Sequence, residues 1–125
     1  MNTKNALMLA GFIALTDTAV KGFIKKPPVK NYGFAGNTLD RHPEKVAIVS
    51  TVLTGAMGAA VFAVPDKLKL PVGMILGGAL SNSADRLIRG YVVDYIPMGK
   101  KMYGNISDFS IFAGSVIGTV KYLLK

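Results

Sequence analysis

Long apolar runs separated by short polar segments dominate the chain. They occupy about residues 5–24, 46–64, 69–88 and 107–124. Each run matches the roughly 20 residues that a helix needs to cross a hydrocarbon core about 30 Å thick. The pattern therefore predicts an all-α membrane protein, in which residues 1–125 form a single domain built as a bundle of four transmembrane helices.

Prolines and glycines mark the ends of these runs. The first helix is expected to end near Ile24, because the segment from Lys25 to Pro28 brings charge and fixed backbone angles. Pro71 is expected in the first turn of the third helix, a position that favours proline. The first loop contains the glycine-rich and aromatic segment from Asn31 to Asn37, which predicts a small extended element at the membrane interface.

Small residues recur four positions apart within the predicted helices. Such spacing lets helix backbones approach closely inside a membrane, where burial of apolar surface drives little association. The pairs are Gly55 with Ala59, Gly73 with Gly77, and Gly114 with Gly118. They predict a compact bundle.

Composition supports the membrane assignment and narrows the chemistry. Half of the residues are hydrophobic, and the chain contains no cysteine. The lack of cysteine excludes disulfides, thiolate nucleophiles and cysteine-based metal sites. The net charge of +8 comes from basic residues scattered among the connecting segments. This distribution favours anionic membrane lipid over nucleic acid as the charged partner.

The polar residues inside or beside the apolar runs are expected to converge at one end of the bundle. Consecutive helices cross a membrane in opposite directions, so the ends of the first and third helices share a face with the start of the fourth. That face carries Asp17, Lys21, Asn31, Asn82, Asp85, Arg86, Asp94, Asn105 and Asp108. A charged side chain at membrane depth costs about 2.5–3.5 kcal/mol on insertion scales, so the convergence indicates a functional site.

Asp94 and Asp108 are the strongest candidates for catalysis. Asp94 lies in a loop that can fold back over the first turn of the fourth helix, where Asp108 is expected. Two neighbouring carboxylates share a proton, which suits a pair that activates water and protonates a leaving group. Arg86 directly follows Asp85 and does not face it on a helix, so both are assigned supporting roles.

Residue chemistry alone leaves several roles open. The charged groups are equally compatible with a catalytic site, an ion or proton pathway, and salt bridges that lock the bundle. A Ser–Lys dyad using Lys21, or a divalent cation held by carboxylates, is less well supported because no spacing selects either. His42 is a lone loop histidine and is expected at the surface. No metal or cofactor is expected.

The order of these motifs resembles that of the lipoprotein signal peptidase family, also called signal peptidase II. The family's Gly-Gly-x-x-x-Asn-x-x-Asp-Arg-x-x-x-Gly-x-Val-x-Asp run matches Gly77, Gly78, Asn82, Asp85, Arg86, Gly90, Val92 and Asp94 position by position. Its Asp-x-x-x-Lys motif is similar to Asp17 to Lys21. Its Asn-x-Gly-Ala-Ala-Phe motif is similar to Asn31 to Gly36, and its Phe-Asn-x-Ala-Asp motif is similar to Gly104 to Asp108.

The chain departs from the family's pattern at several positions. Phe34 and Gly36 stand where the family has alanine and phenylalanine, and Ser107 replaces an alanine. The loop between Asp94 and Asp108 is also short for the family. Because Ser107 is next to Asp108, it is expected to donate a hydrogen bond to that carboxylate. These departures bear on substrate range more than on the reaction.

The resemblance implies an intramembrane aspartyl protease of the bacterial cytoplasmic membrane. Its substrate would be a diacylglyceryl-modified prolipoprotein, cut before the lipidated cysteine by Asp94 and Asp108. The residues that would shape the pocket are Asp17, Lys21, Asn31, Gly33, Asn82, Asp85, Arg86, Gly90 and Asn105. The active site would face the outer side, with both termini cytoplasmic. The alternative is an inactive or specialised relative that binds lipidated peptides.

Overall fold

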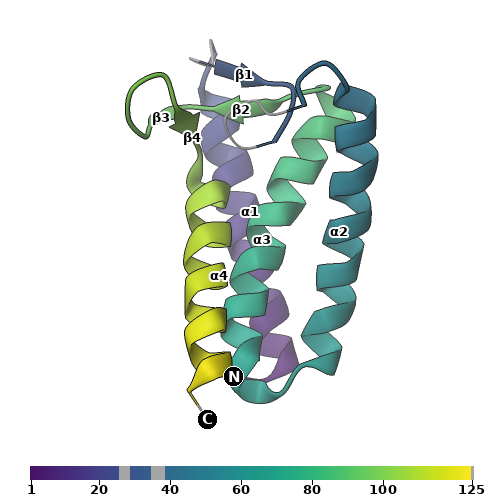
Figure 1. The fold of residues 1–125 in the computed structure, drawn as a ribbon, viewed down its shortest axis with the longest axis vertical. Coiled ribbons are helices and arrows are strands. Elements are labelled where there is room, and N and C mark those ends of the chain that lie inside the picture. Colours follow the sequence, from purple (N-terminus) through teal and green to yellow (C-terminus); the bar gives the residue numbers. More distant parts are fainter. Residues whose placement is uncertain (26–28, 35–38, 125) are drawn as a thin grey trace.

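A computed structural model describes residues 1–25, 29–34 and 39–124 as four helices with short strands covering one end of the bundle (Figure 1). The helices are α1 (Thr3–Phe23), α2 (Pro43–Ala63), α3 (Asp66–Ile88) and α4 (Ile106–Leu123). The central element is α3, which contacts each of the other three helices. Both chain termini lie at the end of the bundle opposite the strands.

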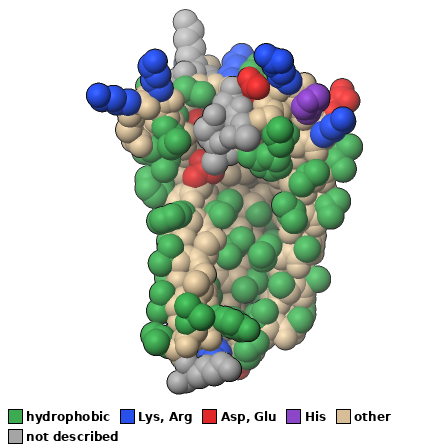
Figure 2. Space-filling view, in the orientation of Figure 1, with side chains coloured by type: hydrophobic (Ala, Val, Ile, Leu, Met, Phe, Trp, Pro, Cys, Tyr) green, Lys and Arg blue, Asp and Glu red, His purple; other side chains and the backbone are tan. Residues whose placement is uncertain are grey.

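The outer surface of the bundle is apolar. Large exposed side chains include Phe12, Phe62, Ile88 and Phe112, one from each helix. Figure 2 shows hydrophobic side chains along the body, whereas most charged side chains in this view gather at the end that carries the strands. Among the described residues, α1 and α2 are each long and apolar enough to cross a membrane. That all four helices cross a membrane stays a prediction.

The predicted start of the third helix at Pro71 is wrong. The helix begins at Asp66 with Pro65 as its N-cap, so Pro71 lies inside it. A proline at this position removes one backbone hydrogen bond from the helix. The buried ring of Pro71 packs against Gly118 of α4, where an added Cβ would lie only 3.3 Å from the proline Cβ. Close packing of α3 on α4 therefore accommodates the interior proline.

Glycines also bring α1 and α3 into close contact, as predicted from their spacing. A Cβ at Gly73 would lie 2.9 Å from the carbonyl oxygen of Ala6, and a Cβ at Gly77 would lie 2.8 Å from that of Ala10. These distances leave no room for side chains between the two backbones. The predicted pair that begins at Gly55 is wrong, because within the described part of the chain nothing lies within 4 Å of its Cβ position.

Two small antiparallel sheets cover the charged end of the bundle. The first sheet pairs β1 with β2, and the second pairs β3 with β4. The bounds are β1 (Val29–Asn31), β2 (Val92–Asp94), β3 (Ile96–Pro97) and β4 (Tyr103–Gly104). The extended element predicted in the first loop is present, although residues 26–28 and 35–37 of the predicted segments lie outside the described residues. The other strands were not predicted, so the fold is mostly helical rather than all-α.

A glycine turn links α3 to β2. Arg89 caps the helix, and Gly90 follows it with a φ of +82°, a left-handed conformation that favours glycine. The turn directs β2 back across the end of the bundle. Gly90 therefore acts on the site through the backbone, by placing the strand that contains Asp94.

Candidate active site at the strand end of the bundle

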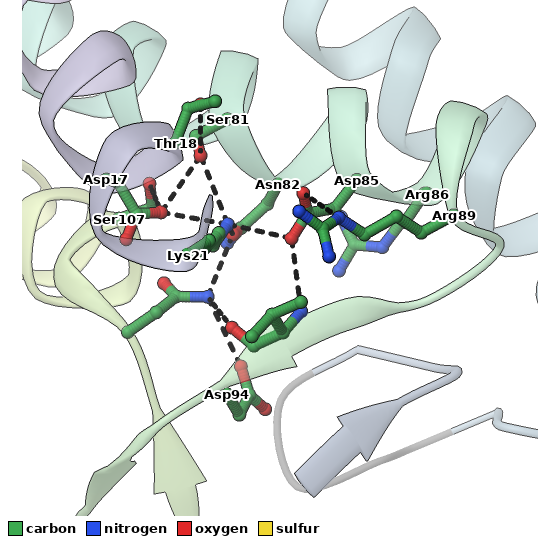
Figure 3. Close-up of polar contacts among 12 residues, drawn as sticks. Asp17, Thr18, Lys21, Ser81, Asn82, Asp85, Arg86, Arg89, Asp94 and Ser107 are labelled. Carbon is green, nitrogen blue, oxygen red and sulfur yellow. Dashed lines mark hydrogen bonds and ion pairs between the residues drawn. The ribbon is translucent and has the colours of Figure 1, made fainter. Parts of the chain in front are cut away.

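Lys21 is a buried cation at the centre of a polar network (Figure 3). Its Nζ lies 2.9 Å from Asp17 Oδ2 and 3.0 Å from Asp85 Oδ2. The same ammonium donates hydrogen bonds of 3.1 Å each to Ser81 Oγ and Asn82 Oδ1. A buried charge is tolerated when it is paired and hydrogen-bonded in this way. Lys21 therefore fastens the end of α1 to the end of α3.

Asp17 extends this network to α4 and to the residue after β2. The Tyr95 hydroxyl donates to Asp17 Oδ1 at 2.5 Å, and Ser107 Oγ donates to Oδ2 at 2.5 Å. Burial is the largest cause of a raised pKa of Tyr95, and the hydrogen bond to Asp17 raises this pKa further. The Tyr95 hydroxyl therefore stays protonated and acts as a donor. The prediction that Ser107 donates to Asp108 is wrong, because adjacent helical residues point in different directions.

Ser81 is held by the same carboxylate. It is 1% exposed, and its hydroxyl donates to Asp17 Oδ2 at 2.9 Å. Ser81 and Lys21 are in contact, as a Ser–Lys dyad would require, but the serine is buried between helices and directed at Asp17. This environment suits a structural hydrogen bond better than attack on a substrate.

Asp94 is a buried carboxylate in β2. Asn31 Nδ2 donates to its Oδ2 at 3.2 Å, and Asn105 Nδ2 donates to its Oδ1 at 3.2 Å. Burial and the nearby negative charge of Asp108 raise the pKa of Asp94 to about 6, although the hydrogen bond from Asn31 opposes this rise. Asp94 thus retains a proton at a pH at which an exposed aspartate is ionised.

Asp108 occupies the first turn of α4, where it forms a reciprocal capping box with Asn105. The Asp108 backbone N–H donates to Asn105 Oδ1 at 2.8 Å, and the Asn105 backbone N–H donates to Asp108 Oδ2 at 3.1 Å. Asn82 Nδ2 donates to the other carboxylate oxygen at 3.0 Å. The helix cap therefore sets the direction of the carboxylate.

Asn82 and Asn105 join the two aspartates into one network. Asn105 Nδ2 donates both to Asp94 and, at 3.0 Å, to Asn82 Oδ1. Asn82 in turn contacts Asp108 and Lys21. The charge of Asp108 also acts on Asp94. The structure thus brings together two carboxylates that are 14 positions apart in the sequence.

Two cavities adjoin this network. The strand-side cavity has a volume of about 360 Å³, and the α2-side cavity has a volume of about 470 Å³. Both are bordered by Phe34, Asn82, Arg86, Asp108 and Ile111. Apolar side chains line much of the rest, with Val92, Met98, Met102 and Phe112 in the strand-side cavity and Leu53, Ala56, Met57 and Ile75 in the α2-side cavity. The α2-side cavity is also bordered by the hydroxyl residues Ser50 and Thr54. Each cavity therefore combines apolar walls with access to Asp108.

Arg86 connects α3 to α2 and to the first loop. Its Nη1 donates to Ser50 Oγ at 2.7 Å, and its Nη2 donates to the Gly33 carbonyl at 3.3 Å. The guanidinium carbon lies 5.2 Å from the centre of the Phe34 ring, within the range of a cation–π contact. The Gly33 backbone is held in turn by Asn31 Oδ1 at 3.0 Å.

Sequence reasoning missed Tyr95 and the hydroxyls of α2. Tyr95 directly follows Asp94, and this position beside a candidate aspartate was the available signal. Ser50 lies in an apolar helix and carried no signal of its own. The residues that the sequence did predict lie in one connected region, with Gly33 contributing backbone groups and Gly90 a turn.

The sequence is similar to those of lipoprotein signal peptidases. The family model described as signal peptidase (SPase) II matches residues 2–124. The lipoprotein signal peptidase of Caldicellulosiruptor bescii is 32% identical over 99 residues, which cover 78% of this chain and 66% of the relative. The lipoprotein signal peptidase of Shewanella oneidensis is 47% identical over 55 residues, which cover 41% and 32%. That of Buchnera aphidicola is 32% identical over 111 residues, which cover 78% and 68%.

These matches span about a third to two thirds of the relatives' own lengths. The fold is also similar to that of solved structures. One, described as a bacterial membrane enzyme, has a TM-score of 0.82 at 21% identity, covering 96% of this chain and 88% of the other. A second structure with the same description has a TM-score of 0.75 at 20% identity, covering 96% and 93%.

Proposed function

Because the chain belongs to the signal peptidase II family, we propose that it is an intramembrane aspartyl endopeptidase for diacylglyceryl-modified prolipoproteins. It removes the signal peptide by cutting before the lipidated cysteine. The observation that supports this proposal is the network that links Asp94 and Asp108 beside two apolar cavities. The curated relatives are named lipoprotein signal peptidases, which gives the substrate class.

The proposed reaction uses Asp94 and Asp108 with one shared proton. The ionised member of the pair takes a proton from water, and the resulting hydroxide attacks the scissile carbonyl carbon. The protonated member hydrogen-bonds to the carbonyl oxygen and later supplies the proton for the leaving amine. The buried position of Asp94 and its raised pKa of about 6 favour retention of this proton. The remaining polar residues of the network hold the two aspartates in position relative to the bound peptide.

The cavities suggest how a lipidated peptide is held. Their apolar walls suit acyl chains and the apolar part of a signal peptide, while Asp108 and Arg86 border both spaces. A lipid anchored in a membrane presents the attached cysteine near the interface, which is the depth expected for the charged end of this bundle. We place the protein in the bacterial cytoplasmic membrane with this end at the outer face and the termini in the cytoplasm.

A cleavage assay tests the proposed function. Purified protein in detergent or lipid is incubated with a diacylglyceryl-modified prolipoprotein and, separately, with the same precursor lacking the lipid. We expect a gel shift to the mature size for the lipidated precursor only. Folded protein that leaves several lipidated precursors intact, yet binds them, would instead favour the lipopeptide-binding alternative.

The activity should fall as pH rises through about 6. The pair needs one proton, and the raised pKa of Asp94, about 6, sets the pH at which that proton is lost. Because the hydrogen bond from Asn31 lowers this pKa, Asn31→Ala should move the falling limb of the kcat/KM profile to higher pH. A wild-type profile that stays flat from acidic to neutral pH, or a shift of the limb to lower pH in the variant, would contradict this assignment.

A further inference from the structure

A row of buried hydroxyl groups lies between α2 and α3, behind Arg86. We define this hydroxyl row as Ser50, Thr54 and Ser83. Ser83 Oγ lies 2.8 Å from Ser50 Oγ and 2.7 Å from Thr54 Oγ1. Each side chain is less than a tenth exposed. The row therefore places three hydrogen-bonded polar groups between α2 and α3.

The hydroxyl row ends at the guanidinium of Arg86. Ser50 Oγ accepts a hydrogen bond from Nη1 at 2.7 Å, whereas the buried Nε has no hydrogen-bond partner among the described residues. Hydrogen bonds to a charged group are stronger than neutral ones and define direction. Ser50 is thus the contact from α2 that determines where the planar guanidinium lies.

The position of Arg86 in turn affects the first loop. The other end of the guanidinium donates to the Gly33 carbonyl, and its face lies against the Phe34 ring. Phe34 borders both the strand-side cavity and the α2-side cavity. A chain of contacts therefore runs from Ser50 through Arg86 to the Phe34 ring, which borders both cavities of the candidate substrate site.

From this chain of contacts we infer that Ser50 is a positioning residue for substrate binding, acting through Arg86 on Phe34. The inference rests on the proposed function, since it assigns the substrate to these two cavities. It is distinct from the role of Asp94 and Asp108, because the hydrogen bonds of Ser50 join it to Ser83 and Arg86 rather than to either carboxylate. Loss of the Ser50 hydroxyl should weaken binding of the lipidated peptide and leave the chemical step intact.

The test compares Ser50→Ala with Thr51→Ala. Thr51 is the neighbouring hydroxyl on α2, but it is exposed, and within the described part of the chain its hydroxyl donates to the Ala47 carbonyl of its own helix, at 2.8 Å. We expect Ser50→Ala to raise KM about tenfold with kcat changed less than about twofold, as for the loss of one charge-assisted hydrogen bond. Thr51→Ala should match the wild type in both constants.

Because Ser50 itself borders the α2-side cavity, a double-mutant cycle separates its action through Arg86 from direct contact with the peptide. In an Arg86→Lys background the forked guanidinium is absent, so Ser50→Ala should raise KM by less than about twofold further. If Ser50→Ala instead multiplies KM tenfold in both backgrounds, the hydroxyl acts independently of Arg86 and the inference is overturned. An unchanged KM in Ser50→Ala overturns it as well, while cleavage by the wild type still supports the proposed function.

Binding measured without cleavage distinguishes the two claims. The probe is a synthetic diacylglyceryl-cysteine peptide, titrated against Asp94→Asn and against Asp94→Asn combined with Ser50→Ala. About tenfold weaker binding by the double variant supports the inference even if the wild type fails to cut any precursor. Equal binding by the two proteins, or no binding by either, overturns it. Thermal unfolding of each variant confirms that folded proteins are compared.

Discussion

Replacement of either Asp94 or Asp108 by asparagine should lower kcat for cleavage of a lipidated precursor by about a thousandfold or more. An amide neither takes a proton from water nor donates one as an acid. The fold should survive, because Asn31 and Asn105 already hydrogen-bond to Asp94, and an asparagine at that position keeps one acceptor oxygen. At position 108 the amide oxygen can still take part in the helix cap.

The control for this prediction is Asp66→Asn. Asp66 is an exposed acid in the first turn of α3, at the end of the bundle opposite the strands. The Asp66→Asn variant should cleave the precursor at the wild-type rate. Initial rates at matched concentrations of folded protein are the measurement. Retention of more than about a tenth of the wild-type rate by either active-site variant would be incompatible with a general acid–base role for that carboxylate.

Lys21→Met should destabilise the protein by about 3–5 kcal/mol, because it removes the buried cation that pairs with Asp17 and leaves Asp85 with only the longer Arg89 ion pair at 3.5 Å. Methionine keeps much of the length of the side chain but removes the ammonium that lies 2.9 Å from Asp17 and 3.0 Å from Asp85. The hydrogen bonds that Ser107 and Tyr95 donate to Asp17 would offset part of the loss. The net loss of stability should still exceed the loss caused by replacing any exposed lysine.

The measurement is the free energy of unfolding of Lys21→Met in mixed detergent micelles, compared with that of the wild type. The matched control is Lys45→Met, which removes an exposed lysine from α2 and should change stability by less than about 0.5 kcal/mol. Equal unfolding free energies for the two variants would mean that the carboxylates beside Lys21 are not held as charged groups. The prediction concerns stability alone and does not depend on the proposed reaction.

The positions of the helices and the convergence of polar residues could be predicted because both follow from chain-wide patterns. Apolar runs of membrane-spanning length gave the four helices, and alternating helix direction indicated which ends meet. The same reasoning placed Asp94, in a loop, close to Asp108, in a helix, before their hydrogen bonds were known. Spacing between glycines also predicted close approach of helix backbones, although it did not indicate that the partner of Gly73 and Gly77 would be α1.

Features that depend on tertiary contacts were not predictable in this way. Pro71 favours a helix start by local preference, but packing against Gly118 stabilises it inside α3. Ser107 was assigned to its sequence neighbour Asp108, although its helical direction carries it to Asp17. The role of Ser50 depends on the arginine that approaches from α3. Short strands such as β3 and β4 are formed by pairing rather than by any periodic pattern.

The most direct measurement of the central claim is the mass of the products from a diacylglyceryl-modified precursor incubated with wild type, Asp94→Asn and Asp108→Asn. We predict that the wild type yields two fragments, with the mature protein beginning at its lipidated cysteine. The two variants should yield neither fragment over the same period. A cut at another position, or the same two fragments from either variant in similar yield, would contradict the assignment of Asp94 and Asp108 as the pair that cleaves before the lipidated residue.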